Sequence, residues 1–279
     1  MGTVTKAMSL IGLFARSTPE LGLSELARRS GLNKTTTYRL MSEMAAQGFV
    51  EQVGAGRAYR LGPAFLRLAA LREQAVPMRE TVQAVVTELA AATGETAHFS
   101  LLEGETLSTL AYAYSPAHGT SVLMDDAEVL TFHGTSSGMA VLAFSPPDFV
   151  DRVLSAPLAA RTPETVTDAA AIRAALPGVR RSGVAVSVGG FEVDVFSHAA
   201  PVFDNTARVV GAVAVAAPVT RMSDALAAQV KRAVIDSARH LTRLTGGFLP
   251  PGFPAPDPAR PTETRTALKT APLPERTQP

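Results

Sequence analysis

Two short amphipathic segments joined through a glycine constrain the fold of this chain more than any other feature of its sequence. The first segment, 24–30, and the second, 33–46, both carry apolar residues at helical spacing, and Gly31 lies between them. Two strand-like runs, 49–53 and 57–61, follow around a glycine-rich tip and predict a hairpin. Two helices joined at a tight turn and followed by a hairpin predict a winged helix-turn-helix.

The start of the second helix carries side chains that suit contact with DNA. Ser24 is a plausible N-cap of the first helix, and Asn33 is a good N-cap of the second. Lys34 and Arg39 can neutralise phosphates, and threonine side chains there can contact phosphates or base edges. Arg57 lies beside the hairpin tip, where a wing reaches the DNA backbone or the minor groove. The predicted DNA-binding residues are Ser24, Asn33, Lys34, Thr35, Thr36, Thr37, Tyr38, Arg39 and Arg57. The alternative is a structural three-helix domain with a solvated basic face.

Charge is divided unevenly along the chain. Residues 1–76 carry ten Lys and Arg against five Asp and Glu, whereas residues 77–248 carry twelve against seventeen. The basic first quarter indicates that only this part approaches a polyanion such as DNA. The chain has no cysteine, which excludes disulfides, thiolate zinc sites, iron–sulfur clusters and cysteine nucleophiles.

The pattern of the remaining sequence separates the other regions. Residues 63–77 predict a linker helix, and residues 78–248 mix strand-like and helical segments as one larger domain. Residues 249–279 contain nine prolines and predict a disordered tail. No apolar run reaches the ~18 residues of a membrane helix, and the first apolar stretch is interpreted as a buried helix instead of a signal peptide. We therefore expect a cytoplasmic protein with no membrane partner.

Several motifs are similar to those of IclR-type regulators. The run 23–62 ends in Ala-Tyr-Arg-Leu-Gly and resembles the N-terminal domain of that family, and residues 89–96 resemble its helix-to-strand passage. Residues 133–143 and the Ala-Ala-Pro-Val-Phe-Asp sequence at 199–204 resemble segments of the family's second domain. The resemblance implies a GAF/PAS-like α/β domain that binds an effector, a dimer formed largely through the N-terminal domains, and frequently a tetramer.

The resemblance also implies where an effector binds. The implied effector-binding residues are Thr135, Ser136, Ser137, Gly138, Met139, Phe191, Phe196, Ser197, Ala214 and Ala216. Helix-start N–H groups near Thr135 can receive an oxygen or a carboxylate, although simple N-capping explains the same residues.

Three departures from the family pattern concern this effector site. Met139 replaces the usual lysine, Gly189-Gly190 stands where an acidic pair is common, and the last strand has alanine where several relatives place serine. These departures predict an organic effector that is larger or less charged than a small keto acid. Loss of ligand binding altogether is the competing explanation.

The sequence contains no recognisable enzyme motif. No dinucleotide-binding fingerprint occurs, and the Gly134–Gly138 segment lacks the preceding apolar strand of a nucleophile elbow. Asp125-Asp126 and Glu128 form a carboxylate cluster that a solvated turn explains. His118, His133 and His198 match no metal-ligand spacing, so we expect no metal, no cofactor and no catalytic residue.

Together these patterns predict an α+β protein in which residues 1–62 form a winged helix-turn-helix domain, joined by the linker helix to a GAF/PAS-like effector-binding domain. The predicted function is a transcription regulator that binds double-stranded operator DNA as a homodimer or homotetramer, with its affinity modulated by a small organic effector. The alternative is an effector-independent repressor whose C-terminal domain serves only oligomerisation.

Overall fold

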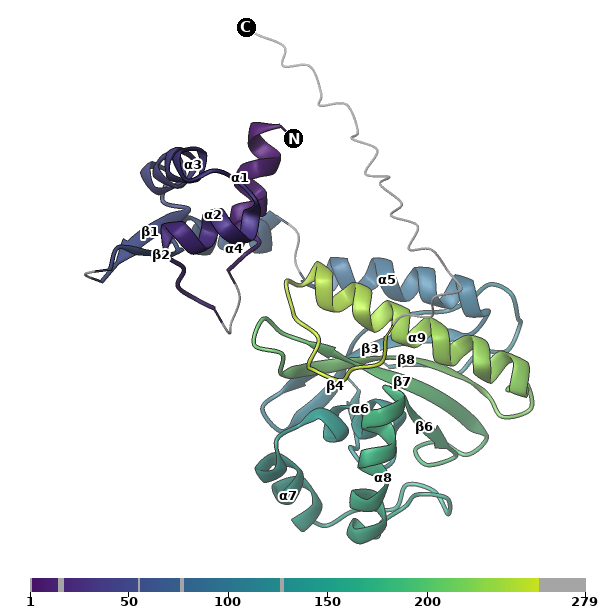
Figure 1. Cartoon of the computed structure of the whole chain (residues 1–279). Coiled ribbons are helices and arrows are strands. Elements are labelled where there is room, and N and C mark those ends of the chain that lie inside the picture. Colours follow the sequence, from purple (N-terminus) through teal and green to yellow (C-terminus); the bar gives the residue numbers. More distant parts are fainter. Residues whose placement is uncertain (1, 15–17, 55, 76–77, 126–127, 256–279) are drawn as a thin grey trace, which may run out of the picture. The chain divides into compact units, whose positions relative to one another are not determined.

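The computed structural model describes residues 2–14, 18–54, 56–75, 78–125 and 128–255. The chain divides into two compact units, Met1–Met78 and Arg79–Pro279 (Figure 1). No helix within the described ranges combines the length and the apolar character that crossing a bilayer needs.

The first unit packs helices and a hairpin around a small apolar core. Its elements are α1 (Thr3–Ile11), α2 (Leu23–Ser30), α3 (Lys34–Ala46), β1 (Val50–Val53), β2 (Ala58–Leu61) and α4 (Ala64–Ala75). Leu10, Leu26 and Met41 come from three helices and are each fully buried in one cluster. Antiparallel β1 and β2 close the hairpin with Val50 opposite Leu61. The predicted winged helix-turn-helix is confirmed.

The turn between α2 and α3 depends on two short-range features of the sequence. Gly31 adopts φ 71°, a left-handed conformation that glycine reaches without a steric penalty, and it ends α2 there. The Asn33 side chain then accepts a hydrogen bond from the backbone N–H of Thr36 at 2.8 Å, which caps α3.

The second unit is built on an antiparallel sheet of six strands within its described residues. These strands are β3 (Thr96–Glu103), β4 (Thr106–Ala113), β5 (Val129–Leu130), β6 (Ala185–Val188), β7 (Val195–Phe203) and β8 (Val209–Pro218). They lie in the order β5-β4-β3-β8-β7-β6, so β3 and β8 are central neighbours. Mostly apolar β8 is buried along nearly its whole length, as expected for a central strand.

Helices cover both faces of this sheet. Helices α5 (Met78–Thr93) and α9 (Asp224–Leu244) lie on one face, and α6 (Ser136–Phe144), α7 (Pro147–Ser155) and α8 (Ala169–Ser182) lie on the other (Figure 1). Ala212 and Ala214 of β8 share a buried cluster with Ala140 and Ala143 of α6. These small side chains let α6 approach the sheet closely. The predicted α+β class is confirmed.

Two elements and the end of the ordered chain differ from the sequence prediction. Helix α7 was not among the elements predicted from the sequence; Pro147 begins it, at a position where the missing N–H of proline leaves no bond unmade. The short edge strand β5 was also not expected.

Part of the predicted tail packs on the second unit. The Phe253 ring contacts the rings of Phe144 and Phe203 at centroid distances of 5.8 and 5.6 Å, so ordered packing continues beyond residue 248. The rest of the predicted disordered tail, 256–279, lies outside the described residues.

Candidate nucleic-acid interface and ligand cavity

The first turns of α3 present polar and basic side chains to solvent. Lys34, Thr35, Tyr38 and Arg39 are exposed, as is the capping residue Asn33, and the Tyr38 side chain is 56% exposed despite its size. Because the buried residues of α3 fix the helix on the core, the exposed side chains form one surface. This surface provides cations, hydroxyls and an aromatic ring at a helix start, the combination that major-groove contact uses.

Not every predicted DNA-binding residue lies on that surface. Thr36 is half-buried, and Thr37 is fully buried with its hydroxyl donating to the carbonyl of Asn33 at 3.0 Å, so Thr37 supports the helix instead of facing outward. Ser24 is exposed on the first turn of α2 but does not cap it, because the helix begins one residue earlier and Gly22 is the N-cap.

The wing and α2 add basic residues whose charges are partly paired. Arg60 of β2 pairs with Glu51 of β1 at 2.6 Å, and Glu25 pairs with both Arg28 and Arg29 on α2. Hydrogen bonds from these two arginines lower the pKa of Glu25 to about 2, so it stays ionised.

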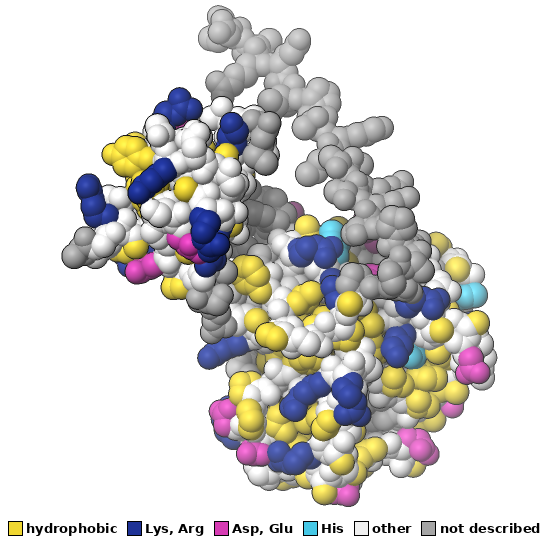
Figure 2. Space-filling model, in the orientation of Figure 1, with side chains coloured by type: hydrophobic (Ala, Val, Ile, Leu, Met, Phe, Trp, Pro, Cys, Tyr) yellow, Lys and Arg dark blue, Asp and Glu magenta, His cyan; other side chains and the backbone are white. Residues whose placement is uncertain are grey.

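On α3 and the wing, three cations are exposed without such pairing, and Arg67 of α4 is a further exposed cation of this unit. Lys34, Arg39 and Arg57 form no ion pair with the described part of the chain. Arg57 has φ 51° beside the hairpin tip. Figure 2 shows Lys and Arg side chains spread over the visible face of this unit. These three residues have the charge most available to phosphates.

The second unit contains a cavity between the start of α6 and the ends of the central strands. It encloses about 470 Å³ of space that protein atoms do not fill, part of it open to solvent. Its walls also include the segment before β5 and the loop between β6 and β7. The lining residues are His98, Val122, Met124, Glu128, Leu130, Thr135, Ser136, Ser137, Ser187, Gly190, Phe191, Glu192, Val195, Ser197 and Ala216.

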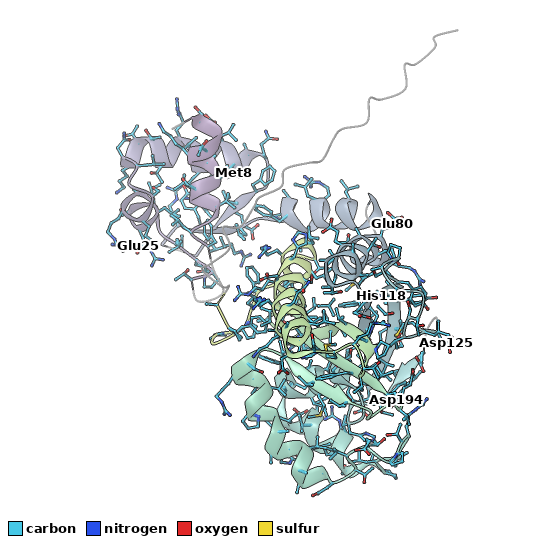
Figure 3. All side chains as sticks on the ribbon, turned by 90° about the vertical axis from the view of Figure 1, so that its right-hand side faces the viewer. Met8, Glu25, Glu80, His118, Asp125 and Asp194 are labelled. Atoms are coloured by element: carbon cyan, nitrogen blue, oxygen red, sulfur yellow. The ribbon has the colours of Figure 1, made fainter. Side chains whose placement is uncertain are left out.

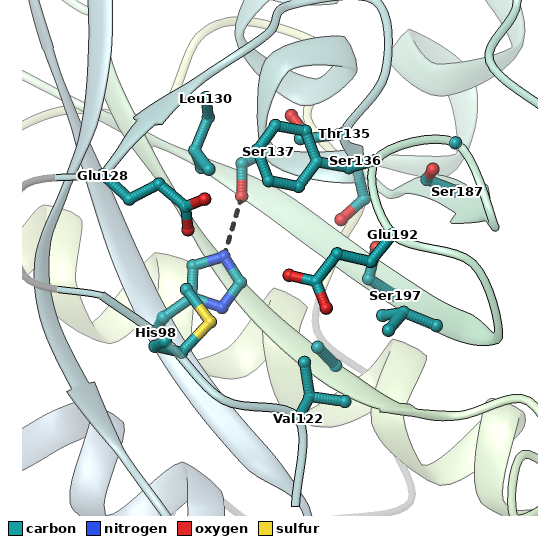
Figure 4. Close-up of a pocket in the computed structure, with 15 residues that line it drawn as sticks. His98, Val122, Glu128, Leu130, Thr135, Ser136, Ser137, Ser187, Glu192 and Ser197 are labelled. Atoms are coloured by element: carbon teal, nitrogen blue, oxygen red, sulfur yellow. Dashed lines mark hydrogen bonds between the residues drawn. The ribbon is translucent and has the colours of Figure 1, made fainter. Parts of the chain in front are cut away.

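His98 is the buried polar residue on the sheet side of this cavity. Its Nε2 lies 3.3 Å from the hydroxyl of Ser137, as Figure 4 shows, and its Nδ1 is buried without a hydrogen-bond partner. Burial disfavours the charged imidazolium and lowers the pKa of His98 to about 4. The ring is therefore neutral at pH 7 and can both donate and accept one hydrogen bond.

Close backbone packing fixes the loop that carries Gly190. The hydroxyls of Thr162 and Thr165 donate to the carbonyls of Gly189 and Gly190 at 2.5 and 2.7 Å. A Cβ on Gly190 would lie 2.7 Å from the carbonyl oxygen of Gly134, closer than side chains tolerate. A residue with a side chain does not fit at position 190, because two loops meet there at backbone distance.

Two carboxylates line the cavity from opposite segments. Figure 4 shows the carboxyl groups of Glu128 and Glu192 directed toward the space above the His98 ring. Burial raises the pKa of both carboxyls; Glu192 raises that of Glu128 further, and Asp125 raises both. Asp125 itself is exposed at the outer edge of the unit in Figure 3. The cavity is therefore acidic in character.

The sequence matches two descriptions of one protein family. Residues 3–54 match the IclR helix-turn-helix domain, and residues 71–243, more than half of the chain, match the bacterial transcriptional regulator IclR C-terminal domain. The chain belongs to the IclR family of transcriptional regulators. It is thus a DNA-binding regulator, as predicted.

Individual IclR-family proteins resemble the chain along most of its length. The glycerol operon regulatory protein of Streptomyces griseus is 32% identical over 88% of this chain and 96% of that protein. The transcriptional repressor IclR of Escherichia coli K12 is 25% identical, with 88% and 90% covered. A crystal structure of an IclR regulator from Silicibacter sp. TM1040 is 55% identical, covers 91% of this chain and 100% of that one, and has a TM-score of 0.87. These relatives are regulators and not enzymes.

The cavity contains six of the ten residues that the IclR resemblance implied, namely Thr135, Ser136, Ser137, Phe191, Ser197 and Ala216. Gly138 and Met139 lie elsewhere: a Cβ on Gly138 would overlap the backbone of Phe132, and Met139 packs against the core. Phe196 cannot share the cavity with Ser197 because successive strand residues face opposite sides, and its ring stacks on His198. Ala214 is buried in the cluster beneath α6.

Sequence reasoning missed the residues that define the chemistry of this IclR-type cavity. His98 alternates with apolar Ala97 and Phe99 in β3, a signal for a polar residue on one face of a strand. Glu128 was interpreted as part of a solvated turn, and Glu192 was not singled out. Within the described residues no three His, Asp or Glu side chains gather closely enough to hold a metal, and Asp126 lies outside those residues.

Proposed function

We propose that this IclR-family regulator binds operator DNA through α3 and the wing, and that a small organic effector bound in the cavity of the second unit changes its affinity for DNA. The observation that carries the proposal is the cavity itself, in which the buried Nδ1 of His98 lacks a partner and polar side chains converge from four segments. A domain that served only oligomerisation would have no need of such a cavity.

The effector we propose is organic and less charged than a small keto acid. Serine is replaced by Ala216 in the cavity wall, and Glu128 and Glu192 line the same space, so an added carboxylate meets like charge there. By contrast, an IclR homologue from Microbacterium hydrocarbonoxydans, 24% identical with a TM-score of 0.54, forms a complex with 4-hydroxybenzoate.

We also propose that the regulator acts as a homodimer or homotetramer. Two copies place two α3 helices on successive turns of the same DNA face, which gives affinity for a palindromic site. Because the DNA bound by bacterial regulators lies in the cytoplasm, we propose that it acts there.

Operator affinity of charge variants tests the DNA half of the proposal. Fluorescence anisotropy with a labelled duplex from DNA upstream of the protein's own gene gives Kd across a range of salt concentrations. Arg39→Ala removes an exposed cation of α3, and we expect Kd to rise about tenfold. The slope of log Kd against log salt concentration should fall by about one, because one phosphate contact is lost. Arg232→Ala removes an equally exposed cation of α9 and should change neither quantity. Equal losses in both variants would contradict the assignment of the DNA surface.

The same titration with a ligand tests the effector half. A small molecule that raises Tm by binding the folded protein is added to wild-type protein and operator. We expect it to change Kd for DNA, because an effector must bind two conformations with different affinity. A ligand that stabilises the protein yet leaves Kd and operator spacing unchanged would favour the alternative, a C-terminal domain that serves only oligomerisation.

A further inference from the structure

The charged side chains that line the cavity are both acidic. Glu128 and Glu192 are the ionisable acids on its wall, no Lys or Arg among the described residues lines it, and His98 is neutral. Arg161 is exposed, with its guanidinium 4.0 Å from the centroid of the Phe191 ring. Its charge lowers the pKa of both glutamates, but burial outweighs it and both pKa values stay raised. A ligand inside the cavity therefore meets negative charge and an unprotonated imidazole.

The helix start of α6 offers an anion only part of its N–H groups. The backbone N–H of Gly138 already donates to the hydroxyl of Thr135 at 2.9 Å, which leaves the N–H groups of Ser136 and Ser137 in the first turn. A carboxylate that accepted from these two groups would share the cavity with Glu128 and Glu192 and would be repelled by their charge.

His98 supplies an independent sign that the cavity lacks a hydrogen-bonding partner. The side chain is 6% exposed, lines the cavity, and has its Nδ1 buried without a partner, which is unfavourable. In the tautomer whose Nε2 donates to Ser137, Nδ1 is an acceptor; in the tautomer whose Nε2 accepts from that hydroxyl, Nδ1 is a donor. A ligand N–H group satisfies the first tautomer.

We propose that the effector is an organic cation, an amine or amidine whose N–H groups bind Glu128 and Glu192 and whose apolar body lies against Phe191, Met124 and Leu130. The inference rests on the proposed effector function and revises one part of it: the effector is not weakly charged but carries a positive charge, opposite in sign to that of a keto acid. The binding of a cation relieves the mutual repulsion of the two carboxylates, which a neutral alcohol does not do. The apolar lining residues bury the carbon skeleton of the same molecule.

Matched probes of one shape and different charge test this inference. Benzylamine, benzoate and benzyl alcohol form one set, and butylamine, butyrate and 1-butanol form another. Each is added at millimolar concentration to the full-length protein without DNA, and Tm and NMR shifts of backbone amides are measured. We expect at least one amine to raise Tm and to shift amides around His98, with the matched acid and alcohol doing neither.

Variants separate specific binding from general charge effects. Glu128→Gln and Glu192→Gln keep side-chain shape and should weaken amine binding at least tenfold. Glu103→Gln, at the exposed end of β3 outside the cavity, should leave it unchanged. The circular dichroism of each variant checks that it folds, and removal of one of two mutually repelling carboxylates should keep the ligand-free Gln variants about as stable as wild type.

Each remaining outcome overturns the inference. Binding of the acids or alcohols in preference to the amines, amine binding that survives both cavity variants, or no binding by any amine would each refute a cationic effector. Any of these results leaves the DNA-binding test of the proposed function unaffected. Conversely, failure of wild-type protein to bind operator DNA would sink the proposed function while amine binding in the cavity could still be measured.

Discussion

The protein keeps the imidazole of His98 neutral at the cost of stability in acid. The ring is nearly fully buried on the central strand β3, and its nearest polar neighbour is the hydroxyl of Ser137. Neither a carboxylate bond nor bulk water stabilises its charged form, so burial lowers the pKa of His98 from 6.5 to about 4. A neutral imidazole at a cavity wall can accept a hydrogen bond from an N–H group or donate one to an acceptor.

The lowered pKa of His98 predicts a pH-dependent stability. Between pH 6.5 and pH 4 the unfolded chain binds a proton on this histidine and the folded chain does not, so stability is full above pH 6.5 and falls as pH drops toward 4. We expect wild type to lose about 3 kcal/mol over this interval relative to His98→Gln, from a shift of about two and a half pKa units. Urea unfolding at several pH values measures the difference.

The control for this measurement is Thr35→Ala, which changes an exposed residue without a titratable group and should show the wild-type pH profile. The raised pKa values of Glu128 and Glu192 act with the opposite sign, since their stability contribution falls as pH rises. They are present in all three proteins, so the comparison isolates His98. Parallel profiles for wild type and His98→Gln would contradict burial of a neutral ring.

At the scale of elements, sequence reasoning succeeded where short-range physics decides. Gly31 ends α2 in a left-handed conformation and Asn33 caps α3, and both follow from local backbone chemistry. It was less accurate where one residue of offset matters: α2 begins at Leu23, so the cap expected of Ser24 is absent. Strand alternation would have excluded Phe196 once Ser197 was placed.

The cavity was harder to predict because tertiary structure assembles it. His98, Glu128 and Glu192 are separated by long stretches of sequence, and only the order of the sheet and the loop contacts bring them together. A glutamate in a turn carries no local sign that it faces a buried histidine. The resemblance to a family located the α6 side of the cavity, but not its acidic side.

The Asn33 cap of α3 should make a measurable contribution to the free energy of unfolding. Asn33→Ala leaves the N–H of Thr36 without its acceptor and should lower the free energy of unfolding by about 1 kcal/mol. Asn33→Ser keeps a capping oxygen without adding charge and should recover most of that loss. Urea unfolding followed by circular dichroism measures both. An alanine variant as stable as wild type would show that α3 does not need its cap.

On the scale of the whole molecule, the excess of basic residues and the ligand cavity belong to different units. Residues 1–76 carry a net positive charge and include the proposed DNA surface, whereas the second unit contains the cavity and residues 77–248 carry a net negative charge. Negative charge repels phosphate, which agrees with the proposal that DNA binds the first unit alone. A cationic effector follows the same division, because it is attracted to the unit that DNA avoids.

Thermodynamic linkage between the two units yields the last prediction. If an effector bound in the cavity changes operator affinity by some factor, operator DNA must change effector affinity by the same factor. For typical couplings of about 1–3 kcal/mol we expect changes of roughly 5- to 150-fold in both directions. Titrating the ligand that changes Kd for DNA into free protein, and into protein saturated with operator, measures the second factor. A scrambled duplex of equal length is the control, since non-specific phosphate contact should not reproduce the coupling. If the two factors differed, the ligand and the operator would not be acting through one shared conformational equilibrium of the protein. The ligand would then act elsewhere, for example on the DNA or on the oligomeric state.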